Sequence, residues 1–188
     1  MGDIVARVKA LLLQPAQEWP VIAAESIDTK SLILGYAAIV SLIPAVMGFI
    51  VTVLLGNLAQ LQVSIGAMLA NTVAQYVLGL VSLWLLGKII QSLVPMFGGL
   101  DDEVAAMKLS VYPPTAVWIA GIFVPIPVAG VLVVLLGLAY SIYIFYLGAP
   151  PVAKVPADKA VLFTIAVSIC SILLSVVIGL LTARLFLG

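Results

Sequence analysis

The polar residues of greatest chemical interest in this 188-residue chain lie in one short apolar stretch, residues 107–124 (MKLSVYPPTAVWIAGIFV). A lysine, hydroxyl side chains and two adjacent prolines fill its first half. This combination could expose backbone carbonyls, donate hydrogen bonds and present one positive charge, which suits a hinge or a site for a polar or anionic solute. The candidate residues are Lys108, Ser110, Tyr112, Pro113, Pro114 and Thr115.

The residue combinations that support most catalytic chemistry are absent from the sequence. There is no histidine, which excludes zinc-protease motifs and Ser-His or Cys-His nucleophilic pairs. The single cysteine, Cys170, has no second cysteine with which to form a disulfide or a metal site. The acids at 101–103 read as a helix N-terminus, with Asp101 as the expected cap. We therefore predict no catalytic, cofactor-binding or metal-binding residues.

The composition places these candidates in a membrane protein. Hydrophobic residues make up 64% of the chain and charged residues only 9%. A soluble domain has about 25% charged residues. A chain of this length could not bury so much apolar surface in one water-soluble core. The sequence therefore predicts an all-α integral membrane protein.

The spacing of the charges predicts the membrane spans. The long charge-free intervals at 31–87, 109–153 and 160–183 contain 57, 45 and 24 residues. One helix crosses the hydrocarbon with about 20 residues, so the first two intervals each hold two crossings and the third holds one. Turns are expected near 56–64 and 124–130. The five predicted transmembrane helices are 31–56, 66–92, 104–124, 128–148 and 160–184.

The basic residues predict the orientation of these spans. Paired crossings return the chain to the side that it left, so seven of the eight basic residues fall on one side and Arg184 on the other. By the positive-inside rule, we expect a cytoplasmic N-terminus and a C-terminus outside, in the cell inner (plasma) membrane. The seven are Arg7, Lys9, Lys30, Lys88, Lys108, Lys154 and Lys159.

Residues 1–30 are predicted to form a cytoplasmic segment with a short amphipathic helix, and 31–188 the membrane domain. Ile4, Val8 and Leu11 share one face of that helix. The helix could lie in the headgroup region or pack under the bundle.

Lys108 and the two prolines each allow two interpretations, which depend on how deep these residues lie in the membrane. Lys108 could snorkel to the interface, which is the more common behaviour, or pair with an acid of the N-terminal segment such as Glu18, Glu25 or Asp28. Pro113 and Pro114 remove N–H groups near the middle of the span, and the nearby hydroxyls could serve the freed carbonyls. We favour a fixed kink over a broken helix that lines a solute site.

Two other helices carry polar faces. Asn71 and Gln75 lie on one face of the second predicted span and could face the proline-containing stretch. A seam of small and hydroxyl residues runs along the last span, where such side chains usually mark a helix interface within one bundle or between copies. The less favoured interpretation is that the seam lines a pore. The seam consists of Thr164, Ser168, Ser171, Ser175, Gly179 and Thr182.

Three short motifs resemble the Yip family of multispanning membrane proteins, in its bacterial branch. The entry segment at 11–25 contains Pro15, Trp19, Ile22 and Glu25 in the family's order. The stretch KLSVYPP at 108–114 resembles the signature of the third span, and YLG at 146–148 resembles the close of the fourth. The resemblance implies five spans, a cytoplasmic N-terminus and a non-enzymatic role.

Eukaryotic members of that family bind Rab GTPases, and the present sequence departs from them. It lacks the Asp-Leu-Tyr-Gly-Pro motif, and Met107-Lys108 replaces the expected Gly-Tyr pair. Rab-type GTPase binding and nucleic-acid binding are not expected. We expect a scaffold or adaptor in membrane organisation, embedded in the lipid bilayer, with a second copy or another membrane protein as partner. The alternative is a small transporter or channel for a polar or anionic solute at the proline-broken third helix.

Overall fold

The computed structural model describes residues 3–58 and 64–187, and its regular structure in these ranges is entirely helical. The all-α fold class is therefore confirmed. The turn predicted near 56–64 falls largely outside the described residues.

The N-terminal segment forms two short helices that pack against the rest of the protein. Helix α1 (Ile4–Leu13) begins at Asp3, whose carboxylate accepts a hydrogen bond from the Val5 N–H at 3.0 Å, and α2 (Pro15–Ala24) begins with a proline at its first position. Leu11 is fully buried. The amphipathic face of α1 thus packs against the bundle, as one of the two placements predicted from the sequence requires.

Four long apolar helices form the body of the molecule. A π-helical stretch (Ser31–Ala37) continues into α3 (Ala38–Leu58), and α4 (Ile65–Leu93) continues into a 3₁₀ turn (Val94–Phe97). Helices α7 (Ala129–Ala153) and α8 (Ala157–Leu187) complete the set. By length and composition, four stretches could cross a membrane: Ser31–Gly56, Ile65–Phe97, Ala129–Ala153 and Ala157–Arg184.

The third predicted span is not one helix. Helix α5 (Glu103–Val111) ends before the prolines, α6 (Thr115–Ala120) follows them, and a 3₁₀ turn (Gly121–Phe123) closes the segment. The single helix predicted over 104–124 is therefore interrupted at Pro113 and Pro114, because two adjacent prolines remove two successive helical hydrogen-bond donors. The cap is also one residue later than expected: Asp102 accepts hydrogen bonds from two N–H groups at 2.8 and 3.1 Å.

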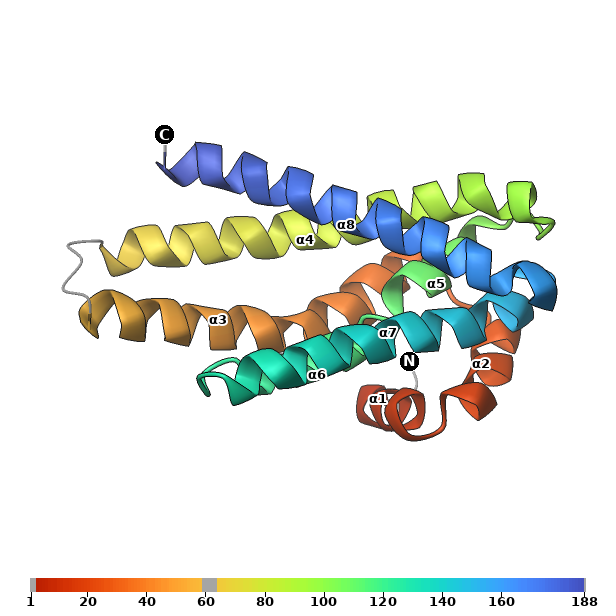
Figure 1. Cartoon of the computed structure of the whole chain (residues 1–188), viewed down its shortest axis with the longest axis horizontal. Helices are drawn as coiled ribbons and strands as arrows, with labels where there is room; N and C mark the ends of the chain where they lie inside the picture. The colour runs from red at the N-terminus through yellow and green to blue at the C-terminus, as the bar shows by residue number, and fades with distance from the viewer. Residues whose placement is uncertain (1–2, 59–63, 188) are drawn as a thin grey trace.

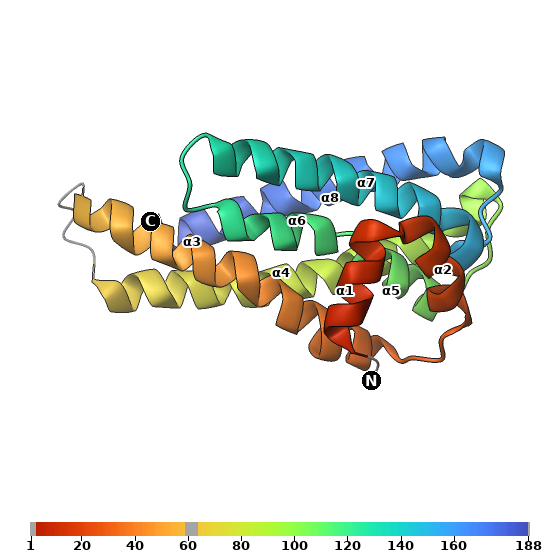
Figure 2. The same cartoon turned by 90° about the horizontal axis from the view of Figure 1, so that it is seen from below.

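The chain runs back and forth along the long axis of the molecule (Figure 1). The C-terminus lies at the end where α3 finishes and α4 begins, and α2 lies towards the opposite end, where α7 finishes and α8 begins (Figure 1). Helix α1 lies across the bundle axis beside α6 (Figure 2), which it contacts.

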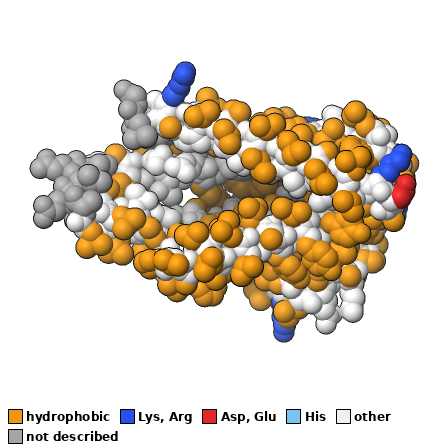
Figure 3. Space-filling view, in the orientation of Figure 1, with side chains coloured by type: hydrophobic (Ala, Val, Ile, Leu, Met, Phe, Trp, Pro, Cys, Tyr) orange, Lys and Arg blue, Asp and Glu red, His pale blue; other side chains and the backbone are white. Residues whose placement is uncertain are grey.

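Burial differs between the two ends of the bundle. The largest fully buried side chains gather where α1, α2 and α5 meet the long helices; they include Trp19, Ile22, Met107, Ile144 and Phe163. The outer faces of the long helices expose large aliphatic side chains, such as Leu136 at 70%. Hydrophobic side chains cover most of the face in Figure 3, which is hollowed near its middle. An apolar surface of this extent is expected to face lipid.

Candidate functional site

The break between α5 and α6 reorganises the hydrogen bonds of the third apolar segment. The Tyr112 N–H still bonds to the Lys108 carbonyl at 3.1 Å, but the Thr115 N–H bonds to the Tyr112 carbonyl at 3.1 Å, one residue closer than in an α-helix. The Thr115 hydroxyl donates to the same carbonyl at 2.6 Å, and the Ser110 hydroxyl donates to the Met107 carbonyl at 3.0 Å. These two hydroxyls therefore serve other carbonyls than the ones freed by Pro113 and Pro114.

Lys108 holds the N-terminal segment by its backbone. Its side chain is buried, with 4% of the residue exposed, and its Nζ lies 2.7 Å from the Ile22 carbonyl and 2.7 Å from the Glu25 carbonyl. These carbonyls belong to the C-terminal end of α2, where a cation is favoured by the helix dipole and by acceptors that have no helical partner. Neither hypothesis from the sequence describes this contact, because the Lys108 side chain is buried and its hydrogen bonds go to carbonyls instead of carboxylates.

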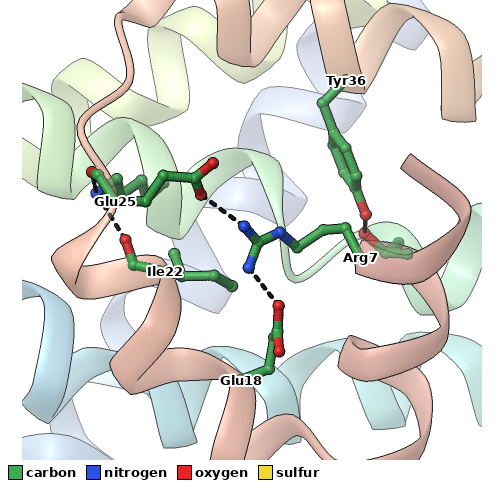
Figure 4. Close-up of polar contacts among 7 residues, drawn as sticks. Arg7, Glu18, Ile22, Glu25 and Tyr36 are labelled. Atoms are coloured by element: carbon green, nitrogen blue, oxygen red, sulfur yellow. Dashed lines mark hydrogen bonds and ion pairs between the residues drawn. The ribbon is translucent and has the colours of Figure 1, made fainter. Parts of the chain in front are cut away.

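Two of the three acids named as partners for Lys108, Glu18 and Glu25, bind Arg7 instead. The guanidinium of Arg7 pairs with Glu18 through one nitrogen and with Glu25 through the other, at 2.7 Å in the second case (Figure 4). It also lies 5.7 Å from the centre of the Tyr112 ring, within the range of a cation–π contact. Arg7 therefore ties α1 to both ends of α2 and to the break.

Aromatic side chains complete this junction. The Trp19 indole N–H donates to the Ile144 carbonyl of α7 at 2.8 Å, and its ring occupies the space left by Gly148. The Tyr36 and Thr115 hydroxyls lie 2.8 Å apart, which joins the π-helical stretch to the start of α6 (Figure 4). The Tyr140 hydroxyl donates to the Leu12 carbonyl at 2.9 Å. We call Arg7, Glu18, Trp19, Glu25, Tyr36, Lys108 and Thr115, with their partners, the N-terminal clamp.

The beginning of the first long helix is also fixed by a hydrogen bond. The Asp28 carboxylate accepts from the Ser31 N–H at 2.6 Å. Hydrogen bonding to Ser31, with a smaller contribution from the positive charge of Lys30, lowers the pKa of Asp28 below its ordinary value. The carboxylate thus remains ionised where the chain enters the bundle.

The polar residues of the break do not form one site with Asn71 and Gln75. Those two amides line a cavity of about 400 Å³ between α3 and α4, to which the break contributes Pro114. Tyr112 lines a separate cavity of about 280 Å³ beside Arg7, Glu18 and Glu25. Ser110 lines another, also of about 280 Å³, between α5, α7 and α8. The break therefore contributes to three cavities, and Lys108 lines none of them.

The small-residue seam of α8 faces the bundle along part of its length. Ser168, Ser171 and Ser175 line the same cavity as Ser110. Thr164 and Thr182 are buried, whereas a side chain at Gly179 would meet no atom within 4 Å. The Thr164, Ser175 and Thr182 hydroxyls donate to carbonyls of α8 itself, at 2.7, 2.9 and 3.0 Å. Within the described residues, the seam makes no hydrogen bond between helices.

No group of three metal-binding side chains occurs in ranges 3–58 and 64–187. Cys170 is a free, half-buried thiol. The described geometry thus offers a polar junction and three cavities as candidate functional features.

Arg7, Trp19 and Tyr36 belong to the junction although their sequence pattern does not predict it. Arg7 counted only as a topology signal, and its partners follow 11 and 18 residues later. Trp19 bonds to a carbonyl 125 residues away, a separation that no local pattern indicates. The order of Pro15, Trp19, Ile22 and Glu25 was the available signal, because these residues include three that are buried and one that binds Arg7.

Comparison with known proteins identifies the domain. A family model described as the Yip1 domain matches residues 9–179. The match begins inside α1 and ends inside α8, so it includes the break and every clamp residue except Arg7, which lies two residues before it. No curated protein and no solved structure matches the chain.

Proposed function

The chain belongs to the Yip1 domain family, and from that premise we propose that it is a non-enzymatic scaffold or adaptor in membrane organisation. The proposed adaptor surface is the exposed side of α1 and α2. The bundle holds these helices in a fixed position, so a partner would meet a preformed surface.

The N-terminal clamp is the observation that carries this proposal. Among the described residues, Lys108 is the charged residue that is buried. Its ammonium group donates hydrogen bonds to two carbonyls of the N-terminal segment. Burying an ammonium costs several kcal/mol unless good hydrogen bonds compensate. A solute site would keep that charge available for ligand, whereas here it positions α2. The geometry therefore favours a structural role for the break.

The surface held by the clamp exposes apolar side chains. Leu13 is 66% exposed and Val21 is 55% exposed. Exposed apolar residues on a rigid, partly charged surface are typical of sites that bind proteins or membranes. The partner expected here is another membrane protein or a second copy, and neither a Rab-type GTPase nor nucleic acid.

In-cell photo-crosslinking tests the adaptor proposal. A photoreactive amino acid at Leu13 or Val21 should give discrete protein adducts, because the clamp holds both positions on one fixed surface. The matched control is Leu136 on the outer face of α7, which is 70% exposed and should label lipid only. Lipid-only labelling at all three positions would count against the adaptor role.

The proposal includes five crossings of the cell inner membrane of a bacterium, with the N-terminus in the cytoplasm and the C-terminus outside. Its support is that α5, α6 and the 3₁₀ turn together connect opposite ends of the bundle, as the four long helices do (Figure 1). Alkaline phosphatase fused after Gly188 should be active, and the same enzyme fused after Lys154 inactive. The reverse result would overturn this orientation.

The seam of α8 bears on whether two copies of the chain contact each other. Ser171 is half-buried and lines the cavity that it shares with α5 and α7, which favours packing within one molecule over contact between copies at this position. In a Cys170→Ala background, Ser171→Cys should give no crosslinked dimer with a short bifunctional reagent. A strong Ser171→Cys dimer would instead assign the seam to a homo-oligomer interface.

Transport is the second candidate, and the cavity of about 400 Å³ beside Pro114 favours it. The sequence predicted a solute site with one positive charge from Lys108, but Lys108 does not line this cavity. Flux assays in proteoliposomes with neutral and anionic solutes test this alternative. Uptake that depends on Gln75 would support transport, and absence of uptake across both panels would remove it.

A further inference from the structure

The cavity between α3 and α4 has the features of a binding site, independent of the adaptor surface. One wall follows a single face of α3 from Ser41 to Thr52, the other follows α4 from Asn71 to Leu83, and Pro114 and Trp118 of the broken segment form the floor. Its volume of about 400 Å³ falls within the range of roughly 300–1,000 Å³ typical of small-molecule sites.

Hydrogen-bonding groups in this cavity lack protein partners. The Ser41 hydroxyl is buried and has no hydrogen-bond partner among the described residues. The side-chain amide of Gln75 donates to the side-chain oxygen of Asn71 at 3.3 Å. In ranges 3–58 and 64–187, that bond leaves the Asn71 amide nitrogen and the Gln75 carbonyl without a protein partner. Gln75 lies about 15 Å along α4 from its start, near the middle of a bilayer. Unpaired amides at that depth require a polar partner.

The chemistry of the lining limits that partner. None of the residues around the cavity is charged, so an ionised headgroup would have no counter-ion. The polar groups share the cavity with Phe49, Leu80 and Trp118, which offer an apolar path beside them. Gln75 is exposed, so the cavity opens at the outer face of the bundle.

We propose that the cavity between α3 and α4 binds an uncharged lipid whose head carries hydroxyl and ester oxygens, of the diacylglycerol class. The head hydroxyl would meet Asn71, Gln75 and Ser41, and the acyl chains would leave along the apolar wall into the bilayer. This ligand supplies both donors and acceptors to the unpaired amides without bringing a charge into hydrocarbon.

Two glycines provide a test of the cavity. Gly48 and Gly79 line the cavity, and a side chain at either would meet no atom within 4 Å. Gly48→Leu with Gly79→Leu therefore adds two side chains to the cavity whose β-carbons meet no atom within 4 Å, and leucine in place of glycine favours the helix. Gly179→Leu is the matched control, because it lies on α8 outside the cavity and is equally free of contacts.

Photoaffinity labelling with the full chain tests the proposal. The protein is reconstituted in phosphatidylcholine vesicles that contain a small fraction of diazirine-labelled diacylglycerol, and labelled peptides are mapped by mass spectrometry. Wild type and Gly179→Leu should be labelled on α3 and α4, and the double leucine variant should lose labelling at least about tenfold, equivalent to about 1.4 kcal/mol of binding. Circular dichroism and gel filtration check that each variant is folded. Asn71→Leu with Gln75→Leu removes the polar contacts and should also lose labelling.

Three outcomes would overturn the proposal. Equal labelling of wild type and the filled variant would place the lipid elsewhere. Displacement of the label by soluble glycerol would assign the cavity to small polyols from solution. Labelling of α3 and α4 no stronger than that of α8 would leave water as the occupant.

Discussion

The two ends of this bundle satisfy their polar groups in different ways. At the end that contains α1, α2 and α5, side chains bond across long sequence separations, as in Lys108 to Ile22 and Trp19 to Ile144. Towards the other end, hydroxyls bond to the preceding turn of their own helix, as in Thr52 to Gly48 and Ser175 to Ser171. The first pattern joins distant segments. The second allows a polar residue to lie in lipid without a partner from another helix.

This difference indicates where the molecule resists change. Loss of a clamp residue leaves buried groups of another segment unpaired, whereas loss of a hydroxyl in α8 affects only its own helix. The clamp end should therefore show large effects of substitution and the opposite end small ones.

Lys108→Met should lower the free energy of unfolding by about 3 kcal/mol, because two buried carbonyls lose a charged donor. Unfolding in mixed micelles with increasing SDS provides the measurement. Lys88→Met is the matched control: Lys88 pairs with Glu103 at 2.9 Å, and both side chains are more than a third exposed. The control should change stability by at most about 0.5 kcal/mol. Equal effects of the two variants would contradict the special position of Lys108.

Gly148→Ala should lower stability by about 2 kcal/mol through overpacking. A β-carbon at Gly148 would lie 2.5 Å from atoms of the Trp19 ring, which the Ile144 carbonyl holds in place. Gly179→Ala, with no atom within 4 Å, should instead raise stability by up to about 1 kcal/mol. Opposite signs in the same unfolding assay would sharpen the comparison, and a neutral Gly148→Ala would break it.

Arg7→Gln should cost about 1.5 kcal/mol, because two partly buried carboxylates lose their partner. A double-mutant cycle with Glu18→Gln isolates the coupling between the two residues. Hydrogen exchange of α1 and α2 should increase in Arg7→Gln and remain unchanged in α8. Additive effects in the cycle would show that the ion pair does not hold the N-terminal segment.

Ser175→Ala should change stability by less than about 0.5 kcal/mol, because its hydroxyl bonds only to the Ser171 carbonyl within α8. Thermal unfolding in detergent is sufficient to compare it with wild type. A loss as large as that of Arg7→Gln would show that the seam makes contacts between helices or between copies, contrary to the local pattern described here.

Part of the candidate site could be read from local sequence. Pro113 and Pro114 locate the interruption of the third apolar segment, because proline lacks an N–H wherever it occurs. Whether the interruption kinks or breaks the helix could not be read in this way. The contact that joins the interruption to the first long helix could not be read locally either, because Tyr36 meets Thr115 from a segment 79 residues earlier.

The sequence by itself determined that this protein has membrane-spanning helices and where its long helices approximately begin and end. Hydropathy and charge spacing are sums over neighbouring residues, and the bilayer responds to those sums. Only the tertiary structure decided that Lys108 binds backbone carbonyls of the N-terminal segment and that Arg7 pairs with Glu18 and Glu25. It also decided that Asn71 and Gln75 line a cavity that Lys108 does not reach. Each of these depends on which distant segments meet, because a buried charge or amide bonds to the nearest available group and not to the partner that its type suggests.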